Sequence, residues 1–135
     1  MEEKDMKKVY LYVSEDGKAP FLNFLSIAEP KLRAKIVQGI RNLAAFPEYM
    51  TEPHVKHFSL ERYNALYEYR ARLRVMVRVI FTLDDKGNII LLHPMVKKRD
   101  RNTMQALESS LKMLEDLRLG FASLAEYTGE EVGAL

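Results

Sequence analysis

The stretch from Leu66 to Thr82 reads Leu-Tyr-Glu-Tyr-Arg-Ala-Arg-Leu-Arg-Val-Met-Val-Arg-Val-Ile-Phe-Thr, a nearly strict alternation of side-chain types. In an extended chain every second side chain points to the same side. One side is then apolar and carries Tyr67, Tyr69, Ala71, Leu73, Val75, Val77, Val79 and Phe81. The other side carries Glu68, Arg70, Arg72, Arg74, Met76 and Arg78. The pattern predicts β-structure with one face in the core and an arginine surface on the other.

The stretch is too long for one ordinary strand, because strands usually contain about 5–6 residues. We therefore expect a bend or a tight turn between Arg70 and Arg74, and we expect it to break the alternation between the two ends. Within Val75 to Phe81 the alternation should hold.

The arginines indicate an anionic ligand, because a guanidinium group stays charged and its planar fork matches phosphate oxygens. The alternative is that they are only solvated charge on the outer face of a sheet. A single acidic residue, Glu68, lies among them, and both interpretations stay open.

Length and composition predict one globular domain. The chain has 135 residues, is 47% hydrophobic and contains no cysteine, which excludes disulfides, thiol nucleophiles and thiolate metal sites. It has no apolar run long enough to cross a membrane, and its charged start is unlike a secretory signal. We therefore expect a cytoplasmic protein without a membrane association.

The charges are distributed unevenly along the chain. Residues 1–53 have a net charge of 0, residues 54–101 of +6, and residues 102–135 of −4. A basic middle segment within a nearly neutral protein is typical of a nucleic-acid surface carried by the central strands.

Local patterns predict a strand, two helices, three or four strands and a last helix. The strand is expected at Val9–Val13, one helix begins at Pro20, and the next runs from Pro30 to Pro47. A hairpin turn is expected at 84–88, a buried strand after it, and a bulge, end or sheet edge at Pro94.

The C-terminal part is expected to be helical and then irregular. Asn102 is the predicted N-cap, with Gln105 at the capping-box position, and the helix should end near Gly120. We expect the domain to span residues 1–120, followed by a short, weakly ordered extension over 121–135. The class is therefore α+β, an antiparallel-rich sheet with helices against one face and the arginine face open.

A second basic cluster, His93–Arg101, follows the last predicted strand of the sheet. One interpretation is a solvated loop without a ligand. However, the hairpin should bring His93 and Arg78 onto neighbouring strands, so that both basic clusters can form one patch. Cleavage of RNA through its 2′-OH needs a base, cations and an acid, but no metal. The candidate bases are His93, Lys97 and Lys98, and no histidines or carboxylates have convincing metal-ligand spacing. The basic residues Arg72, Arg74, Arg99 and Arg101 are expected to bind RNA.

These motifs, in this order, resemble the RelE/HigB superfamily of toxins, and most closely its phage-derived HigB-like branch. The resemblance rests on Leu-Tyr-Glu-x-Arg at 66–70, Val-Arg-Val-Ile-Phe at 77–81, the Asp/Gly hairpin, and Ile-Ile-Leu-Leu-His followed by Lys-Lys. It covers about Tyr10 to Leu117. The chain lacks the tyrosine that some RelE members have after the basic run.

The resemblance implies a microbial-RNase-like fold and a metal-independent mRNA endonuclease that acts on the translating ribosome. It implies catalytic roles for Arg70, Arg78, His93, Lys97 and Lys98, an RNA-binding role for Lys56, and no cofactor. The implied partners are mRNA, the ribosome and a cognate antitoxin, expected to be a small helix-turn-helix protein. The alternatives are a non-enzymatic ParE-like toxin that acts on DNA gyrase, and a basic binding module without catalysis.

Overall fold

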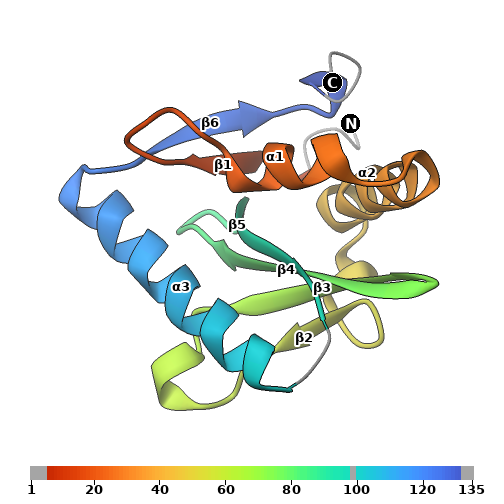
Figure 1. Ribbon diagram of the computed structural model, residues 1–135. Coiled ribbons are helices and arrows are strands. Elements are labelled where there is room, and N and C mark those ends of the chain that lie inside the picture. Colours follow the sequence, from red (N-terminus) through yellow and green to blue (C-terminus); the bar gives the residue numbers. More distant parts are fainter. Residues whose placement is uncertain (1–5, 98–99, 132–135) are drawn as a thin grey trace.

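The computed structural model describes residues 6–97 and 100–131. The elements along the chain (Figure 1) are β1 (Val9–Val13), α1 (Pro20–Ile27), α2 (Pro30–Ala45), η2 (Pro47–Met50), β2 (Val55–His57), η3 (Glu61–Tyr63), β3 (Tyr67–Leu73), β4 (Val75–Leu83), β5 (Ile89–Val96), α3 (Asp100–Leu119) and β6 (Ser123–Tyr127). None of the helices in these ranges is both long and apolar enough to cross a membrane.

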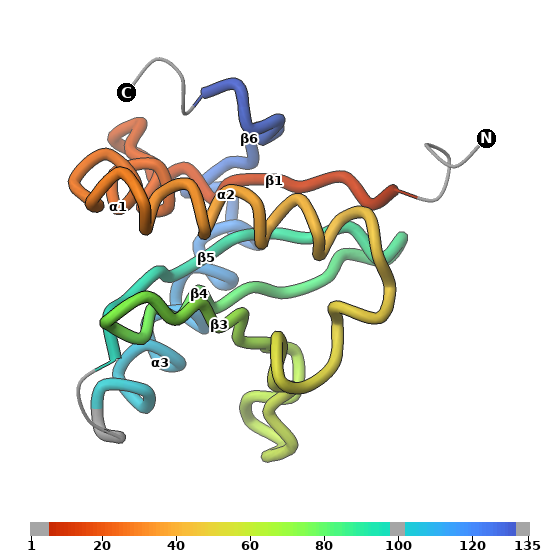
Figure 2. The backbone as a smooth tube through the Cα atoms, turned by 90° about the vertical axis from the view of Figure 1, so that its right-hand side faces the viewer, coloured from red at the N-terminus to blue at the C-terminus, as the bar shows by residue number. Residues whose placement is uncertain are grey.

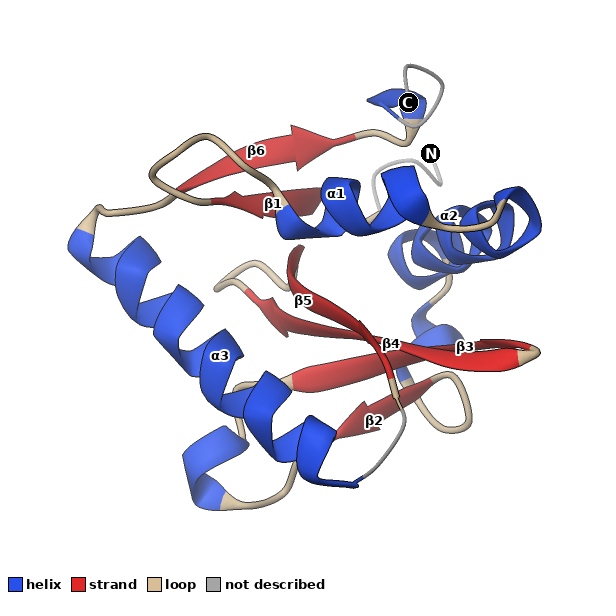
Figure 3. Ribbon diagram, viewed as in Figure 1, coloured by secondary structure: helices blue, strands red, loops and turns tan. Residues whose placement is uncertain are grey.

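The six strands of the described chain form one sheet with the order β2-β3-β4-β5-β1-β6 (Figure 3). β1 runs parallel to β5, and every other neighbouring pair is antiparallel. The predicted α+β class with an antiparallel-rich sheet is confirmed.

The long alternating stretch folds into β3 and β4, which are joined at Arg74. Leu73 pairs with Val75, and Arg74 between them has a φ of 65°, in the left-handed region. The predicted turn is confirmed, but the predicted break in alternation is wrong. Because the strands pair about one central residue, even positions lie opposite even positions, as Arg70 lies opposite Arg78. The arginines of both strands therefore share one face.

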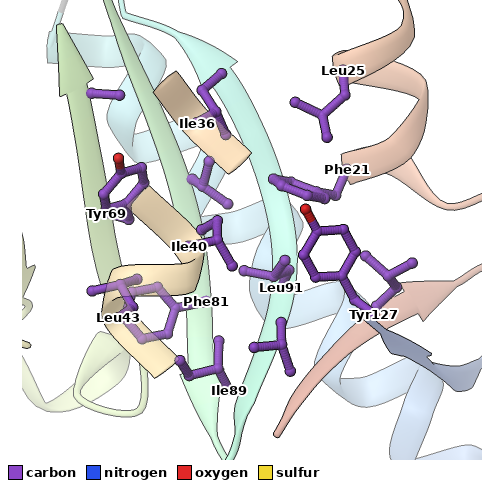
Figure 4. Packing of buried hydrophobic residues seen from close by; sticks show 14 of the residues in the cluster. Phe21, Leu25, Ile36, Ile40, Leu43, Tyr69, Phe81, Ile89, Leu91 and Tyr127 are labelled. Atoms are coloured by element: carbon purple, nitrogen blue, oxygen red, sulfur yellow. The ribbon is translucent and has the colours of Figure 1, made fainter. Parts of the chain in front are cut away.

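α1 and α2 cover one face of the sheet (Figure 2). Each helix has a proline in its first turn, where the missing backbone N–H has no intrahelical partner to lose. The side chains that fill this core come from both helices and from all six strands of the described sheet, including the odd positions of β3 and β4. Figure 4 shows Phe21, Leu25, Ile36, Ile40, Leu43, Tyr69, Phe81, Ile89, Leu91 and Tyr127 in it.

α3 packs against the opposite face, so the prediction that this face stays open is wrong for the part that α3 covers (Figure 2). Leu107 and Leu111 of α3 form a second core with Ile80 and Leu92. The physical reason is that Ile80 of β4 and Ile90 and Leu92 of β5 form an apolar surface on this face, which needs a cover.

Pro94 lies in β5, where that strand has a neighbour on one side. β1 pairs with β5 only as far as Leu91, while β4 continues to pair opposite Pro94. The register also shifts between Ile80 and Phe81, as at a β-bulge. A residue without an N–H is tolerated at such a position, and the prediction of an edge or bulge is confirmed.

The two ends of α3 differ in how well the sequence predicted them. The helix begins at Asp100, so the prediction that Asn102 is its N-cap is wrong. Both residue types favour helix starts, and the local pattern could not choose between them. The end near Gly120 is confirmed: Gly120 has a φ of 82°, and the Phe121 N–H donates to the Asp116 carbonyl at 2.8 Å.

The segment after Gly120 joins the sheet, so the prediction of a weakly ordered extension is wrong for Ser123–Tyr127. This segment is β6, which pairs with all five residues of β1. The Tyr127 ring is buried and meets the Phe21 ring edge-on, with centroids 5.5 Å apart. The alternation of residues 123–127 is too short to distinguish a strand from a loop. Only the pairing with β1, which is distant in sequence, identifies it as a strand.

Candidate functional site

The candidate site consists of rows of residues that lie opposite one another on neighbouring strands. The first row runs across the sheet from β2 to β5. Lys56 lies opposite Glu68, Glu68 opposite Ile80, and Ile80 opposite His93. All four side chains are on the face that α3 partly covers. The prediction that the hairpin at 84–88 brings His93 and Arg78 onto neighbouring strands is confirmed.

The second row contains the two central arginines. Arg70 lies opposite Arg78, and Arg78 opposite Met95. His93 is a diagonal neighbour of Arg78, and such pairs have Cα atoms roughly 7–8 Å apart. A group of the size of a phosphate can therefore contact both side chains.

The third row reaches the outer end of the hairpin. Arg72 pairs with Met76, and the Lys97 N–H donates to the Met76 carbonyl at 2.9 Å. Arg72 is exposed and Lys97 is half-buried. Six of the predicted site residues therefore share one face: Lys56, Arg70, Arg72, Arg78, His93 and Lys97.

Glu68 lies at the centre of this face and is fully buried. Its Oε2 accepts a hydrogen bond from Arg70 Nε at 3.0 Å and another from Arg78 Nη1 at 2.7 Å. Arg70 also donates to Glu52 Oε1 at 3.3 Å. These charge-assisted bonds fix the two guanidinium groups, whose side chains are 23% and 12% exposed.

The network is not saturated within the described residues. Glu68 Oε1 and Arg78 Nε are buried and have no hydrogen-bond partner there. Glu68 and Glu52 together balance the charges of Arg70 and Arg78, but Glu52 is largely exposed and contacts only Arg70. An anion that displaces Glu52 would meet two guanidinium groups that Glu68 already holds in place.

His93 lies beside a hollow between β5 and α3. The hollow has a volume of about 420 Å³ and is lined by His93, Met95, Val96, Asn102, Gln105, Ala106 and Ser109. Burial lowers the pKa of His93 below 6.5, because desolvation disfavours the imidazolium form. Burial therefore favours the uncharged ring, in which one nitrogen can accept a proton.

The remaining predicted residues lie at the margin or outside the described part of the chain. Arg74, in the turn, pairs with Glu29 at 2.6 Å and does not join the central network. Lys98 and Arg99 lie outside the described residues, as does the side chain of Arg101, whose backbone belongs to α3.

The described residues contain no group of three or more His, Asp or Glu side chains arranged to hold a metal ion. The chemistry that they can supply is anion binding by guanidinium and ammonium groups, and proton transfer by a neutral imidazole.

Sequence reasoning placed Glu68 among the arginines but assigned it no function. The available signal was its position: it is the one acidic residue in an arginine face, two residues before Arg70. Pairing of β3 with β4 then brings it diagonally opposite Arg78. A lone carboxylate among strand arginines is a candidate for a buried counter-ion.

The comparison with protein families finds one similarity. The model of a family described as phage derived protein Gp49-like (DUF891) matches residues 23–115, which is more than half of the chain. The matched range begins in α1, ends in α3 and includes all the site residues above. No curated protein matches the chain significantly.

Proposed function

The chain belongs to the family of Gp49-like phage-derived proteins, and we propose that it is the toxin of a toxin–antitoxin pair. In this proposal it has a RelE-like fold of the HigB-like branch and cleaves mRNA on the translating ribosome without a metal ion. Its site of action is the cytoplasm, and its antitoxin is a small helix-turn-helix protein.

One observation supports the proposal most strongly: two fixed arginines lie beside a half-buried histidine on the neighbouring strand. Arg70 and Arg78 are held by Glu68, and His93 occupies the next row of the sheet. Cleavage through the 2′-OH needs cations at the phosphate and a base near the sugar. On this face the arginines and His93 are close enough to contact the same nucleotide.

The proposed reaction is a transesterification. His93 accepts the 2′-OH proton, the 2′-oxygen attacks phosphorus, and the bond to the 5′-oxygen breaks to give a 2′,3′-cyclic phosphate. Arg70 and Arg78 stabilise the charge of the pentacoordinate phosphorane. Lys97, on the same face, is the ammonium group proposed to protonate the leaving 5′-oxygen.

The other basic residues are proposed to hold the RNA strand. Lys56 and Arg72 flank the central arginines, and Arg74 extends the basic surface at the hairpin turn. Lys98, Arg99 and Arg101 follow the last site strand; Lys98 is a further candidate for the base, and the other two would contact phosphates. Such contacts are independent of sequence and weaken as salt increases.

The test is expression of the chain without a partner, followed by mapping of mRNA 5′ ends with and without translation. We expect cuts that require translation and that disappear in His93→Gln. Growth arrest with intact mRNA would contradict the nuclease proposal. Arg118→Ala is the matched control, because Arg118 is exposed and pairs with Glu115 far from the site.

The role of Arg78 in cleavage needs a substitution that leaves the protein folded. Arg78→Ala would leave Glu68 with one partner fewer in a buried position, which typically costs about 3–5 kcal/mol. Arg78→Lys keeps the charge but removes the planar fork. We expect this variant to remain folded and to lose most of the cutting, since a single ammonium group does not reproduce bidentate phosphate binding.

The pH dependence tests the role of His93. A base must be deprotonated to act, and the pKa of His93 lies below 6.5. In a purified translation system, cleavage should be constant from pH 8 to about 7 and should decline only as the pH falls below about 6.5. A rate that declines already between pH 8 and 7 would assign the base to a group of higher pKa.

A second candidate is a non-enzymatic toxin that acts on DNA gyrase. The observation that favours it is that both central arginines are engaged by Glu68, as structural arginines would be. DNA-damage signalling in expressing cells, without RNA cuts, is the result expected from this candidate.

A further inference from the structure

Two histidines outside the candidate site each stack on a tyrosine. His57, the last residue of β2, pairs with Tyr67 of β3, and their rings are 4.5 Å apart at 18°. Tyr67 in turn stacks on Phe81 at 5.3 Å and 17°. The three rings form a continuous stack that starts in the core and ends at the edge of the sheet.

The outer ring of this stack is held in place and open to solvent. β2 is the last strand on its side of the sheet (Figure 3), and His57 is exposed. The His57 ring is also fixed by a 2.7 Å hydrogen bond between its Nε2 and the Asn64 carbonyl. One ring face rests on Tyr67, and within the described residues no second ring stacks on His57.

The surroundings of His57 suit a nucleic acid. Lys56, next to it in β2, points to the arginine-bearing face of the sheet. Three residues before His57, His54 stacks on Tyr49 at 4.2 Å and 20°. Glu52, an acidic group near this edge, is paired with Arg70. An aromatic partner from a protein could also stack here, but Lys56, beside His57 on the other face of the same edge strand, favours a ligand that carries phosphates.

We propose that the exposed ring face of His57 is a stacking surface for an unpaired nucleobase of single-stranded RNA. The proposal rests on the proposed function in taking RNA as the ligand. His57 points to the face of the sheet opposite the arginines, as Tyr67 and Phe81 do. It is two strands and three residues along the strand from Arg78, roughly 14 Å in the plane of the sheet, so the stacked base would belong to a nucleotide a few positions from the one being cleaved. The strand would cross the β2 edge, with a phosphate at Lys56 and a base on His57.

The experiment uses the full chain and a short single-stranded RNA oligonucleotide with one 2-aminopurine, whose fluorescence is quenched by stacking. For the native chain we expect quenching at one position of the probe. His57→Ala should abolish that quenching and weaken binding by a factor of about five to a hundred, while His57→Phe should restore both. Thermal unfolding of each variant shows whether it is folded.

The outcomes separate this proposal from the proposed function. If His57→Ala binds the probe as tightly as the native chain and quenches it equally, the stacking surface is wrong, whether or not the chain cleaves mRNA. If His57→Ala weakens binding of the cognate antitoxin but not of RNA, the ring is a protein contact and the proposal is again wrong. Quenching that depends on His57 supports it even in a chain that never cuts mRNA.

Discussion

Glu68 contributes both to the stability of the fold and to the geometry of the candidate site. Its carboxylate is fully buried, yet it accepts hydrogen bonds from two arginines that belong to neighbouring strands. Removal of one partner from a buried ionic cluster leaves uncompensated charge, which costs far more than loss of an exposed pair. The same cluster therefore stabilises the β3–β4 hairpin and fixes the cations of the candidate site.

Glu68→Gln should lower the free energy of unfolding by about 3–5 kcal/mol, because it leaves Arg70 and Arg78 without their shared counter-ion. The measurement is urea unfolding at neutral pH. Glu29→Gln makes the same chemical change in the exposed pair with Arg74 and should cost about 1 kcal/mol or less. Equal losses in the two variants would contradict the role assigned to Glu68.

Among the elements, α2 approaches β3 unusually closely at Gly39. A Cβ built on Gly39 would lie 1.6 Å from the Tyr69 hydroxyl oxygen and 2.4 Å from the adjacent ring carbon. Tyr69 is itself buried within the first core, so its ring has no room to withdraw. Gly39 weakens α2 as a helix, but only a residue without a Cβ leaves room for the Tyr69 ring at this position.

Gly39→Ala should destabilise the protein by about 1–3 kcal/mol through overpacking, although alanine favours a helix by about 1 kcal/mol over glycine. Thermal unfolding gives the sign directly. In a Tyr69→Leu background the same substitution should lose most of its cost, because the clashing atoms are gone. A gain in stability from Gly39→Ala in the native chain would show that α2 can shift away from β3.

α3 is fixed over the second core by a polar contact with η3. Arg62 donates two hydrogen bonds to Glu108, at 2.7 and 2.6 Å, and the Tyr63 hydroxyl donates to the same carboxylate. These hydrogen bonds lower the pKa of Glu108 from 4.5 to about 2. The carboxylate form is favoured in the folded state, so this contact contributes stability above pH 4.5 and loses it as the pH falls towards 2.

Unfolding measured between pH 5 and pH 2 should therefore be steeper in pH for the native chain than for Glu108→Gln. Glu130→Gln is the matched control, because it makes the same chemical change at an exposed side chain. If the two variants have the same pH dependence, the Arg62–Glu108 contact does not hold α3.

At the scale of the whole molecule, the sequence predicted what local patterns control. Alternation at 66–82 predicted both strands of the hairpin, and the prolines at the first positions of α1 and α2 marked where these helices begin. The sequence could not predict what depends on distant neighbours. The cover of α3 over Ile80, the pairing of β6 with β1, and the burial of Glu68 between arginines all follow from packing across the sheet.

β6 depends on neighbours that are distant in sequence, and its packing can be tested by its effect on stability. Tyr127 is buried against Phe21, and burial raises its pKa to about 12. Its hydroxyl has no hydrogen-bond partner among the described residues. Tyr127 therefore stabilises the fold through its ring, while its buried oxygen contributes a desolvation cost.

Tyr127→Phe should be neutral or stabilising by up to about 1 kcal/mol, since it removes only the unpaired oxygen. Tyr127→Ala should cost about 3–5 kcal/mol, because it leaves a cavity beside Phe21 in the core shared by α1, β1 and β6. Urea unfolding of the pair measures both. If Tyr127→Ala is tolerated as well as Tyr127→Phe, β6 is peripheral to the domain and the core closes without it; a large difference makes residues 121–127 an integral part of the fold.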